Sequence, residues 1–136
     1  MSPHPDVYRV SNDKKYGYQN VGRLGWHIDG SYRPAPFKVQ IMHFWAQSKG
    51  GVTLFSPMQE LLESLTPEER REWEQLHFVS DSEAHPLIYP HPVTGNPAMA
   101  FHCGKPFHRT FAKNYNEKTG EAEETYDAKK TADMIY

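Results

Sequence analysis

Chain-breaking residues are distributed along the whole of this sequence. Its 136 residues include 11 prolines and 9 glycines, which recur between short apolar runs from Pro3 to Gly120. Proline removes a backbone donor and glycine favours turns, so the segments between them are short. This punctuation predicts short strands joined by turns and loops, with few helices, and it argues against a helical bundle.

The size and composition predict a single domain. The 15 basic and 17 acidic side chains give a net charge of −2, which offers no support for a nucleic-acid partner. No apolar run reaches the roughly 18 residues of a membrane span, and the first residues lack the features of a signal peptide. We therefore expect a cytoplasmic protein without a membrane partner. The single cysteine, Cys103, excludes an internal disulfide and a multi-cysteine zinc site.

Short apolar runs between turns predict five strands. They cover residues 26–32, 38–46, 52–55, 87–89 and 98–102. The run 38–46 is the most apolar, so we expect it to be buried, with Trp45 in the core and His43 as an ordinary strand histidine. Trp26 is also assigned to the core.

The middle of the chain changes to helical spacing. A first helix is predicted with Ser56 as its cap and Pro57 at its first position, from the helical spacing of the apolar residues Met58, Leu61, Leu62 and Leu65. Thr66 and Glu69 have the spacing of a capping box, which opens a second helix expected to carry Trp73 and Leu76. Residues 114–130 are charged and predict a solvated loop, with a last helix beginning near Asp127.

Two candidate metal ligands stand two residues apart in the first predicted strand. His27 and Asp29 would share one face of that strand, because side chains alternate with a period of two. An imidazole nitrogen beside a carboxylate oxygen, completed by a third ligand, forms the facial triad of non-haem Fe(II) oxygenases. The alternative is a strand-edge histidine that hydrogen-bonds to its neighbour's carboxylate.

Several blocks around this pair resemble one enzyme family. They are Trp26–Tyr32, Pro36-Phe37, Gly50–Phe55, Met58–Leu62 and His85–Gly95. In this order, over residues 22–111, they resemble the taurine dioxygenase/chlorophenoxyacetate dioxygenase family of Fe(II)- and 2-oxoglutarate-dependent oxygenases. The resemblance implies a double-stranded β-helix (jelly-roll) with its metal at the open mouth of the barrel. It also implies that a small organic substrate is hydroxylated with dioxygen while 2-oxoglutarate yields succinate and CO₂.

The resemblance assigns roles to individual residues. His27 and Asp29 match the first two iron ligands, and Thr53 matches a threonine that contacts a carboxylate of 2-oxoglutarate. A second set matches positions that line the substrate pocket, with solvated or ordinary packing roles as the alternative: Arg23, Tyr32 and Gly104.

The other histidines receive no role on iron. His85 and His91 flank the turn of a hairpin, where the family does not use them as ligands. His102, Cys103 and His108 form a looser group, interpreted as at most an adventitious metal site, with Cys103 as a small buried side chain.

The resemblance ends before the family's pattern is complete. In the family, a third-ligand histidine and then a 2-oxoglutarate-binding arginine follow far downstream, whereas the last ones here are His108 and Arg109. We therefore expect residues 1–136 to be a partial domain that lacks its C-terminal strands. Its predicted parts are a loop-rich start (1–25), a core (26–111), and a polar loop with the start of a helix (112–136).

The missing strands have consequences that the sequence leaves open. Apolar surface that they would cover should be exposed, so the isolated chain is expected to be marginally stable or to self-associate, and a homo-oligomer remains open. The missing ligands are expected from a longer chain, with a second chain as the alternative. The alternative function is a non-catalytic jelly-roll binding module. A zinc-dependent hydrolase fits less well, because no convincing third ligand or general base accompanies the pair.

Overall fold

The computed structural model describes residues 11, 13, 15, 26–33, 35–47, 49–50, 52–80, 83–102 and 110–135. This part of the chain contains three helices and six strands. In chain order they are α1 (Met58–Ser64), α2 (Pro67–Glu74), β1 (Leu76–Val79), β2 (Ala84–Pro86), β3 (Ile88–Pro90), β4 (Pro97–Met99), β5 (Thr110–Lys113), β6 (Glu124–Thr125) and α3 (Ala128–Ile135).

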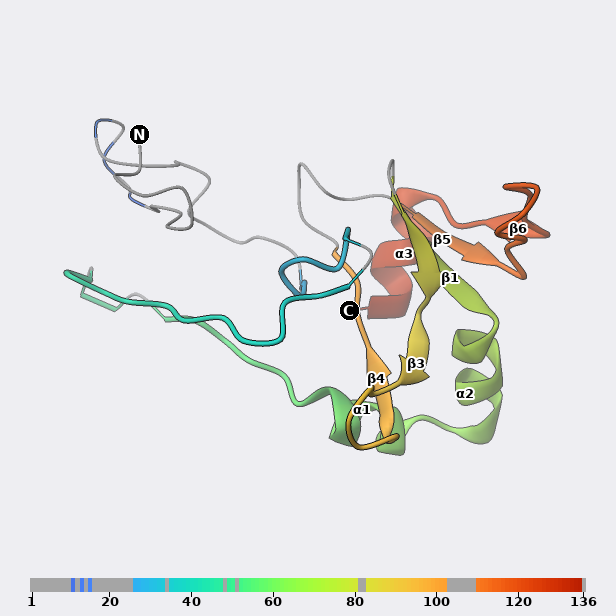
Figure 1. The fold of residues 1–136 in the computed structure, drawn as a ribbon, viewed down its shortest axis with the longest axis horizontal. Helices are drawn as coiled ribbons and strands as arrows, with labels where there is room; N and C mark the ends of the chain where they lie inside the picture. Colours follow the sequence, from blue (N-terminus) through green and yellow to red (C-terminus); the bar gives the residue numbers. More distant parts are fainter. Residues whose placement is uncertain are drawn as a thin grey trace.

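The strands form two antiparallel sheets. The larger sheet has the order β2-β1-β5-β6, and β3 pairs with β4 in a separate hairpin. Figure 1 shows the helices and the larger sheet gathered in one body, with the hairpin beside α1. The described part is therefore β-rich with few helices, as the sequence predicts.

The core lies between the larger sheet, the hairpin and the helices. Phe78 of β1 faces Phe111 of β5 in register, and their rings meet edge to face at 6.2 Å between centroids. Phe101 extends this contact, with its ring 6.1 Å from that of Phe111. Burial of such apolar surface supplies most of the stabilisation of the fold. The buried core residues are Leu62, Trp73, Leu76, Phe78, Leu87, Met99, Phe101, Phe111 and Tyr126.

Helix α2 begins with the predicted capping box. The Thr66 hydroxyl accepts a hydrogen bond from the Glu69 backbone N–H, while the Thr66 N–H donates to the Glu69 carboxylate at 2.8 Å. This donation lowers the pKa of the Glu69 carboxyl. The prediction that the helix reaches Leu76 is wrong, because the helix ends at Glu74 and Leu76 begins β1. Leu76 and Phe78 are buried alternately along that strand, which is a period of two.

The other two helices also form near their predicted positions. Helix α1 begins at Met58, one residue later than predicted, because Pro57 is its N-cap rather than its first residue. Helix α3 begins beside Asp127, whose carboxylate accepts the backbone N–H of Lys130 at 2.7 Å. The predicted loop 114–130 is mostly exposed but also contains β6 and the buried Tyr126. No helix in the described part of the chain is long and apolar enough to span a membrane.

The hairpin of β3 and β4 agrees with the predicted turn around Gly95. This glycine has a φ of 73°, a conformation that other residues adopt at a cost. The His91 N–H donates to the Asn96 carbonyl at 2.8 Å and closes the turn. The predicted strand over 98–102 is shorter than expected, since β4 ends at Met99, and β2 was not predicted.

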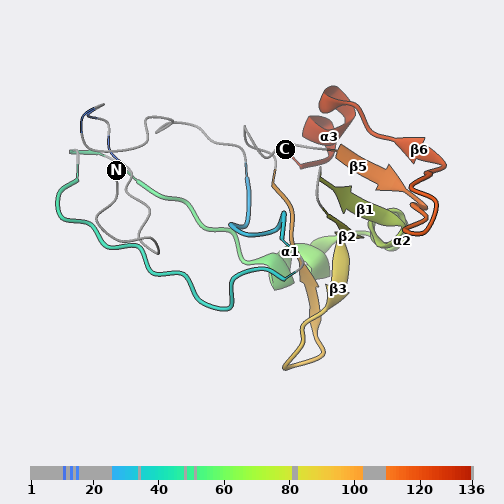
Figure 2. The ribbon, with the colours of Figure 1, turned by 45° about the horizontal axis from the view of Figure 1, so that its top comes forward.

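The predicted buried strand over residues 38–46 is contradicted by the structure. Residues 35–47 and 52–57 belong to no strand, and they form extended chain that leaves the body and returns at α1 (Figures 1 and 2). Trp45, predicted in the core, is 93% exposed and Ile41 is 86% exposed, while His43 is also exposed. The predicted strand over 52–55 is wrong for the same reason. Among the described residues no strand pairs with this segment, so its apolar side chains remain uncovered.

A candidate metal centre

The sequence around His27 folds as one bridge residue followed by a turn. His27 pairs with His102 in an isolated antiparallel bridge, and the Ile28 N–H donates to the Phe101 carbonyl at 2.9 Å. The predicted strand over 26–32 is therefore wrong beyond the bridge, because the chain turns at Asp29. Gly30 permits this turn with a φ of 81° and lies against the Phe37 ring, where an added Cβ would be only 3.1 Å away.

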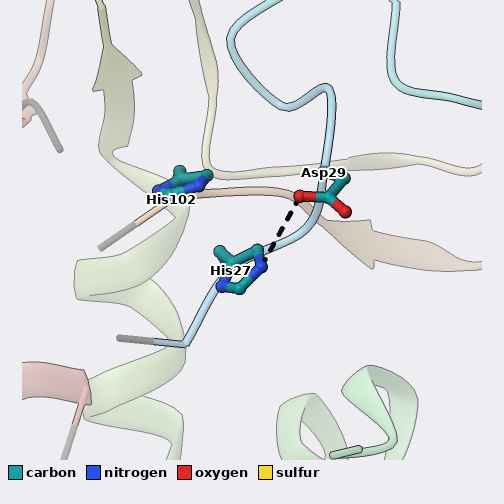
Figure 3. Close-up of side chains that lie close together, drawn as sticks. All are labelled: His27, Asp29 and His102. Atoms are coloured by element: carbon teal, nitrogen blue, oxygen red, sulfur yellow. Dashed lines mark ion pairs between the residues drawn. The ribbon is translucent and has the colours of Figure 1, made fainter. Parts of the chain in front are cut away.

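The turn brings the carboxylate of Asp29 to the ring of His27. Nε2 of His27 lies 3.5 Å from Oδ1 of Asp29, and Figure 3 shows the carboxylate oxygen directed at the ring. The other oxygen, Oδ2, accepts a hydrogen bond from the side-chain amide of Gln40 at 2.5 Å. Gln40 thus fixes the carboxylate so that Oδ1 is turned towards His27, the kind of support that neighbouring groups give to metal ligands.

His102 is the third member of this group. Its ring stacks on that of His27, with centroids 4.6 Å apart and planes inclined by 29°, and its exposed fraction is only 5%. One ligand atom from each of His27, Asp29 and His102 lies within 4.8 Å of the others. Figure 3 shows the three side chains converging from the turn at 27–29 and from the segment that follows β4.

His85 attaches the turn that carries Asp29 to the larger sheet. Nε2 of its ring lies 2.9 Å from the carbonyl oxygen of Ser31, and because a carbonyl only accepts, the imidazole is the donor. The His85 ring also packs 5.4 Å from Phe78 and 6.2 Å from Tyr89. His85, which the sequence leaves without a role on iron and places beside a hairpin turn, lies in β2 of the larger sheet and supports the turn of the candidate site.

The predicted cofactor and substrate residues have different positions. The Tyr32 ring stands 6.4 Å from that of His102, edge-on, so it lies beside this member of the candidate site. Thr53 is exposed in the extended segment 52–57, and no hydrogen bond or ion pair among the described residues joins it to His27 or Asp29. Arg23 and Gly104 lie outside the described residues.

Sequence reasoning missed two members of the site. Gln40 falls in a run read as a buried strand, and His102 was grouped with Cys103 and His108, both outside the described residues. The available signal was His102 at the end of an apolar strand pattern, because a polar ring there needs a partner when buried.

A second hollow of the described chain lies between α2 and α3. It is lined by Glu69, Glu72, Trp73, Tyr126, Lys130, Asp133 and Met134. There the Tyr126 hydroxyl donates to the Glu72 carboxylate at 2.7 Å, and burial together with this carboxylate raises the pKa of Tyr126. These interactions tie α2 to the chain before α3, and the lining includes none of the three candidate ligands.

Comparisons with known proteins find similar sequences. A family model described as "Taurine catabolism dioxygenase TauD, TfdA family" matches residues 1–129. Pentalenolactone F synthase from Streptomyces arenae is 40% identical over 74 residues, which are 50% of this chain and 25% of that protein. The matched stretch is thus about a quarter of the relative's length. No solved structure matches the chain.

Proposed function

The chain belongs to the taurine catabolism dioxygenase TauD, TfdA family, and from this premise we propose that its parent enzyme is an Fe(II)- and 2-oxoglutarate-dependent dioxygenase. In this proposal a small organic substrate is hydroxylated with dioxygen, and 2-oxoglutarate is converted to succinate and CO₂. Membership of this family supports a dioxygenase in general. The observation that carries the finer proposal is the convergence of His27 and Asp29, whose donor atoms are 3.5 Å apart.

The donor atoms present fit Fe(II). Imidazole nitrogen and carboxylate oxygen are the ligands that this ion takes in oxygenases with one open face. His27 and Asp29 supply one of each from a single turn, and Gln40 holds the free carboxylate oxygen in place. When bound there, the metal would supply the activation of dioxygen, which protein side chains cannot perform themselves.

This chain's own residues have the tasks of holding and orienting. We propose that His27 and Asp29 anchor the metal, while Tyr32 limits the space beside it and Thr53 contacts a carboxylate of 2-oxoglutarate. Because Thr53 is exposed in a segment that no described strand covers, its role requires that this segment folds onto the site in the complete enzyme. Arg23 and Gly104 are proposed as further substrate-facing residues on the strength of the resemblance alone.

The architecture of the complete enzyme is part of the proposal. The antiparallel pairing seen here is compatible with a jelly-roll in which residues 1–136 are the loop-rich start, the core and the first turn of a further helix. Exposed apolar side chains over residues 37–55 support a further layer of structure on that segment. We propose a cytoplasmic enzyme whose partners are dioxygen and a small molecule, and which can form a homo-oligomer.

The test is the release of succinate by the full-length parent protein. With Fe(II), dioxygen and labelled 2-oxoglutarate, we expect succinate and CO₂ to form, slowly without substrate and faster when a library of small organic acids contains one. His27→Ala and Asp29→Ala should abolish the release, while His43→Ala, which changes an exposed histidine outside the site, should retain it. Release that persists in both site variants would refute the proposal, and a parent protein that never releases succinate would favour a binding module.

A further inference from the structure

We propose that His102 is a positioning residue of the metal centre, whose ring holds the ring of His27 in the orientation that binds the metal. This inference deepens the proposed function and rests on its assignment of His27 and Asp29 as ligands. In this role His102 acts through His27 and does not bind the metal itself. The remaining ligands are left to other parts of the complete enzyme.

The backbone pairing brings the two histidine rings together. His27 and His102 are partners in an isolated antiparallel bridge, and the Ile28 N–H donates to the Phe101 carbonyl at 2.9 Å. Side chains directly opposite in such a pair project to the same face, with Cβ atoms about 4.5–5.5 Å apart. The contact between the rings is therefore set by the backbone, although the two residues are far apart in the sequence.

The stack constrains the plane of the His27 ring. The ring centroids are 4.6 Å apart and the planes are inclined by 29°, so His102 covers one face of His27. Rotation of the His27 ring out of this plane would separate the pair and lose the attraction of the stack. A flip of 180° preserves the plane, but Asp29 selects the edge, because its Oδ1 lies 3.5 Å from Nε2 (Figure 3). The stack and the carboxylate together fix the orientation of the ring.

His102 can impose this orientation because its own ring is held in place. It is 5% exposed, and the Tyr32 ring meets it edge-on with centroids 6.4 Å apart. Its neighbour Phe101 is buried in the core, where its ring lies 6.1 Å from that of Phe111. The His27 side chain is less buried, at 27% exposed. The more buried ring thus limits the motion of the more exposed one, the kind of support that neighbouring groups give to metal ligands.

Two substitutions of His102 separate stacking from the chemistry of its nitrogens. His102→Phe keeps a flat aromatic ring without a nitrogen, whereas His102→Leu removes the flat ring. We expect His102→Phe to keep the affinity of His27 for Zn(II) within about twofold. His102→Leu should weaken that affinity roughly threefold to tenfold, which is the range that one aromatic contact supplies.

The affinity is measured by nuclear magnetic resonance of the whole 136-residue chain with ¹⁵N-labelled histidine rings, titrated with Zn(II). The shift of the His27 signal reports binding at that ring alone. His43→Leu, the same change at an exposed histidine outside the site, should leave the affinity within about twofold. Circular dichroism checks that each variant is folded. Unchanged affinity in a folded His102→Leu variant, or a loss in His102→Phe as large as that in His102→Leu, would overturn the inference.

A measurement without metal keeps the inference testable even where His102→Leu does not fold. In the unchanged chain, nuclear Overhauser contacts should join the ring protons of His27 and His102, because the centroids are 4.6 Å apart. Absence of these contacts would show that the rings do not stack and would overturn the inference.

The outcomes separate this inference from the proposed function. If His27 binds Zn(II) equally well in His102→Leu, the inference fails and the dioxygenase proposal stands. If binding depends on the ring at position 102 but the full-length parent protein never releases succinate, the inference stands and the dioxygenase proposal fails. No saturable shift of His27 in the unchanged chain would overturn both.

Discussion

Replacing His85 should weaken both the fold and the metal site, although His85 contacts no candidate ligand. In His85→Ala, the turn that carries Asp29 loses its hydrogen bond to the sheet, which joins the His85 ring to the Ser31 carbonyl at 2.9 Å. Ser31 is fully buried, so water does not replace the lost donor. The carbonyl oxygen would be left without that partner.

The magnitude follows from these contacts. A lost hydrogen bond that leaves a buried acceptor unpaired costs about 1–3 kcal/mol, and loss of the ring contacts to Phe78 and Tyr89 adds about 0.5–1.5 kcal/mol. We therefore expect His85→Ala to lower the free energy of unfolding by about 1.5–4.5 kcal/mol. The part of this energy that holds the turn of Asp29 against the sheet also holds Asp29 in place for the metal. If that part is about 2.8 kcal/mol, metal affinity falls roughly a hundredfold, since 1.4 kcal/mol corresponds to a factor of ten.

Urea unfolding and calorimetric titration with Co(II) measure the two effects. His85→Gln keeps a donor and should recover about half of the lost stability, whereas the exposed His43→Ala should change it by less than about 0.5 kcal/mol. A His85→Ala variant with unchanged stability and unchanged metal affinity would show that the turn is held by other contacts, and this reasoning would be wrong.

Three further predictions concern other parts of the described chain. Ile41 and Trp45 are 86% and 93% exposed, so replacing both with serine should change the unfolding free energy by less than about 1 kcal/mol. The same change should reduce self-association, measured by size-exclusion chromatography with light scattering. A large loss of stability would show that the two side chains are buried. Burial lowers the pKa of His77 below its ordinary 6.5, against the opposing effect of Glu117. The stability that the neutral His77 ring contributes to the fold is therefore fully present above about pH 6.5, and it is lost as the pH falls through the lowered pKa of the folded state. Urea unfolding should show the unfolding free energy decreasing from about pH 7 to pH 5. The slope of this decrease should be smaller in His77→Asn. Gln40→Ala should weaken Co(II) binding about tenfold by releasing the Asp29 carboxylate, and an unchanged affinity would remove Gln40 from the site.

Local signals predicted the elements whose stability is local. The capping box of Thr66 and Glu69 and the glycine turn at Gly95 depend on hydrogen bonds between residues close in sequence, so the sequence alone identified them. The start of α3 beside Asp127 is of the same kind. Such signals locate the ends of helices and turns but not the partners of a strand.

Burial depends on what covers a segment, and this the sequence pattern does not contain. The apolar run around Trp45 has the composition of a core strand, yet no described strand pairs with it and its side chains are exposed. Conversely, Leu76 was assigned to the second helix, but it begins the strand Leu76–Val79, which is central to the sheet through pairing with β2 and β5. In both cases long-range pairing decided the outcome.

The candidate site divides in the same way. His27 and Asp29 were found because a spacing of two in an extended chain suggests shared chemistry, although a turn rather than a strand brings them together. His102 lies 75 positions from His27 and joins it only through an isolated bridge between distant segments. No local pattern around His102 encodes that contact, so the sequence alone did not associate His102 with His27.

The central claim is that His27 and Asp29 bind a ferrous ion to which 2-oxoglutarate then binds. The most direct measurement is visible absorption of the full-length parent protein, loaded with Fe(II) under anaerobic conditions, as 2-oxoglutarate is added. We predict a saturable charge-transfer band in the unchanged protein and none in Asp29→Ala. No band in the unchanged protein, or an identical band in the variant, would contradict the claim.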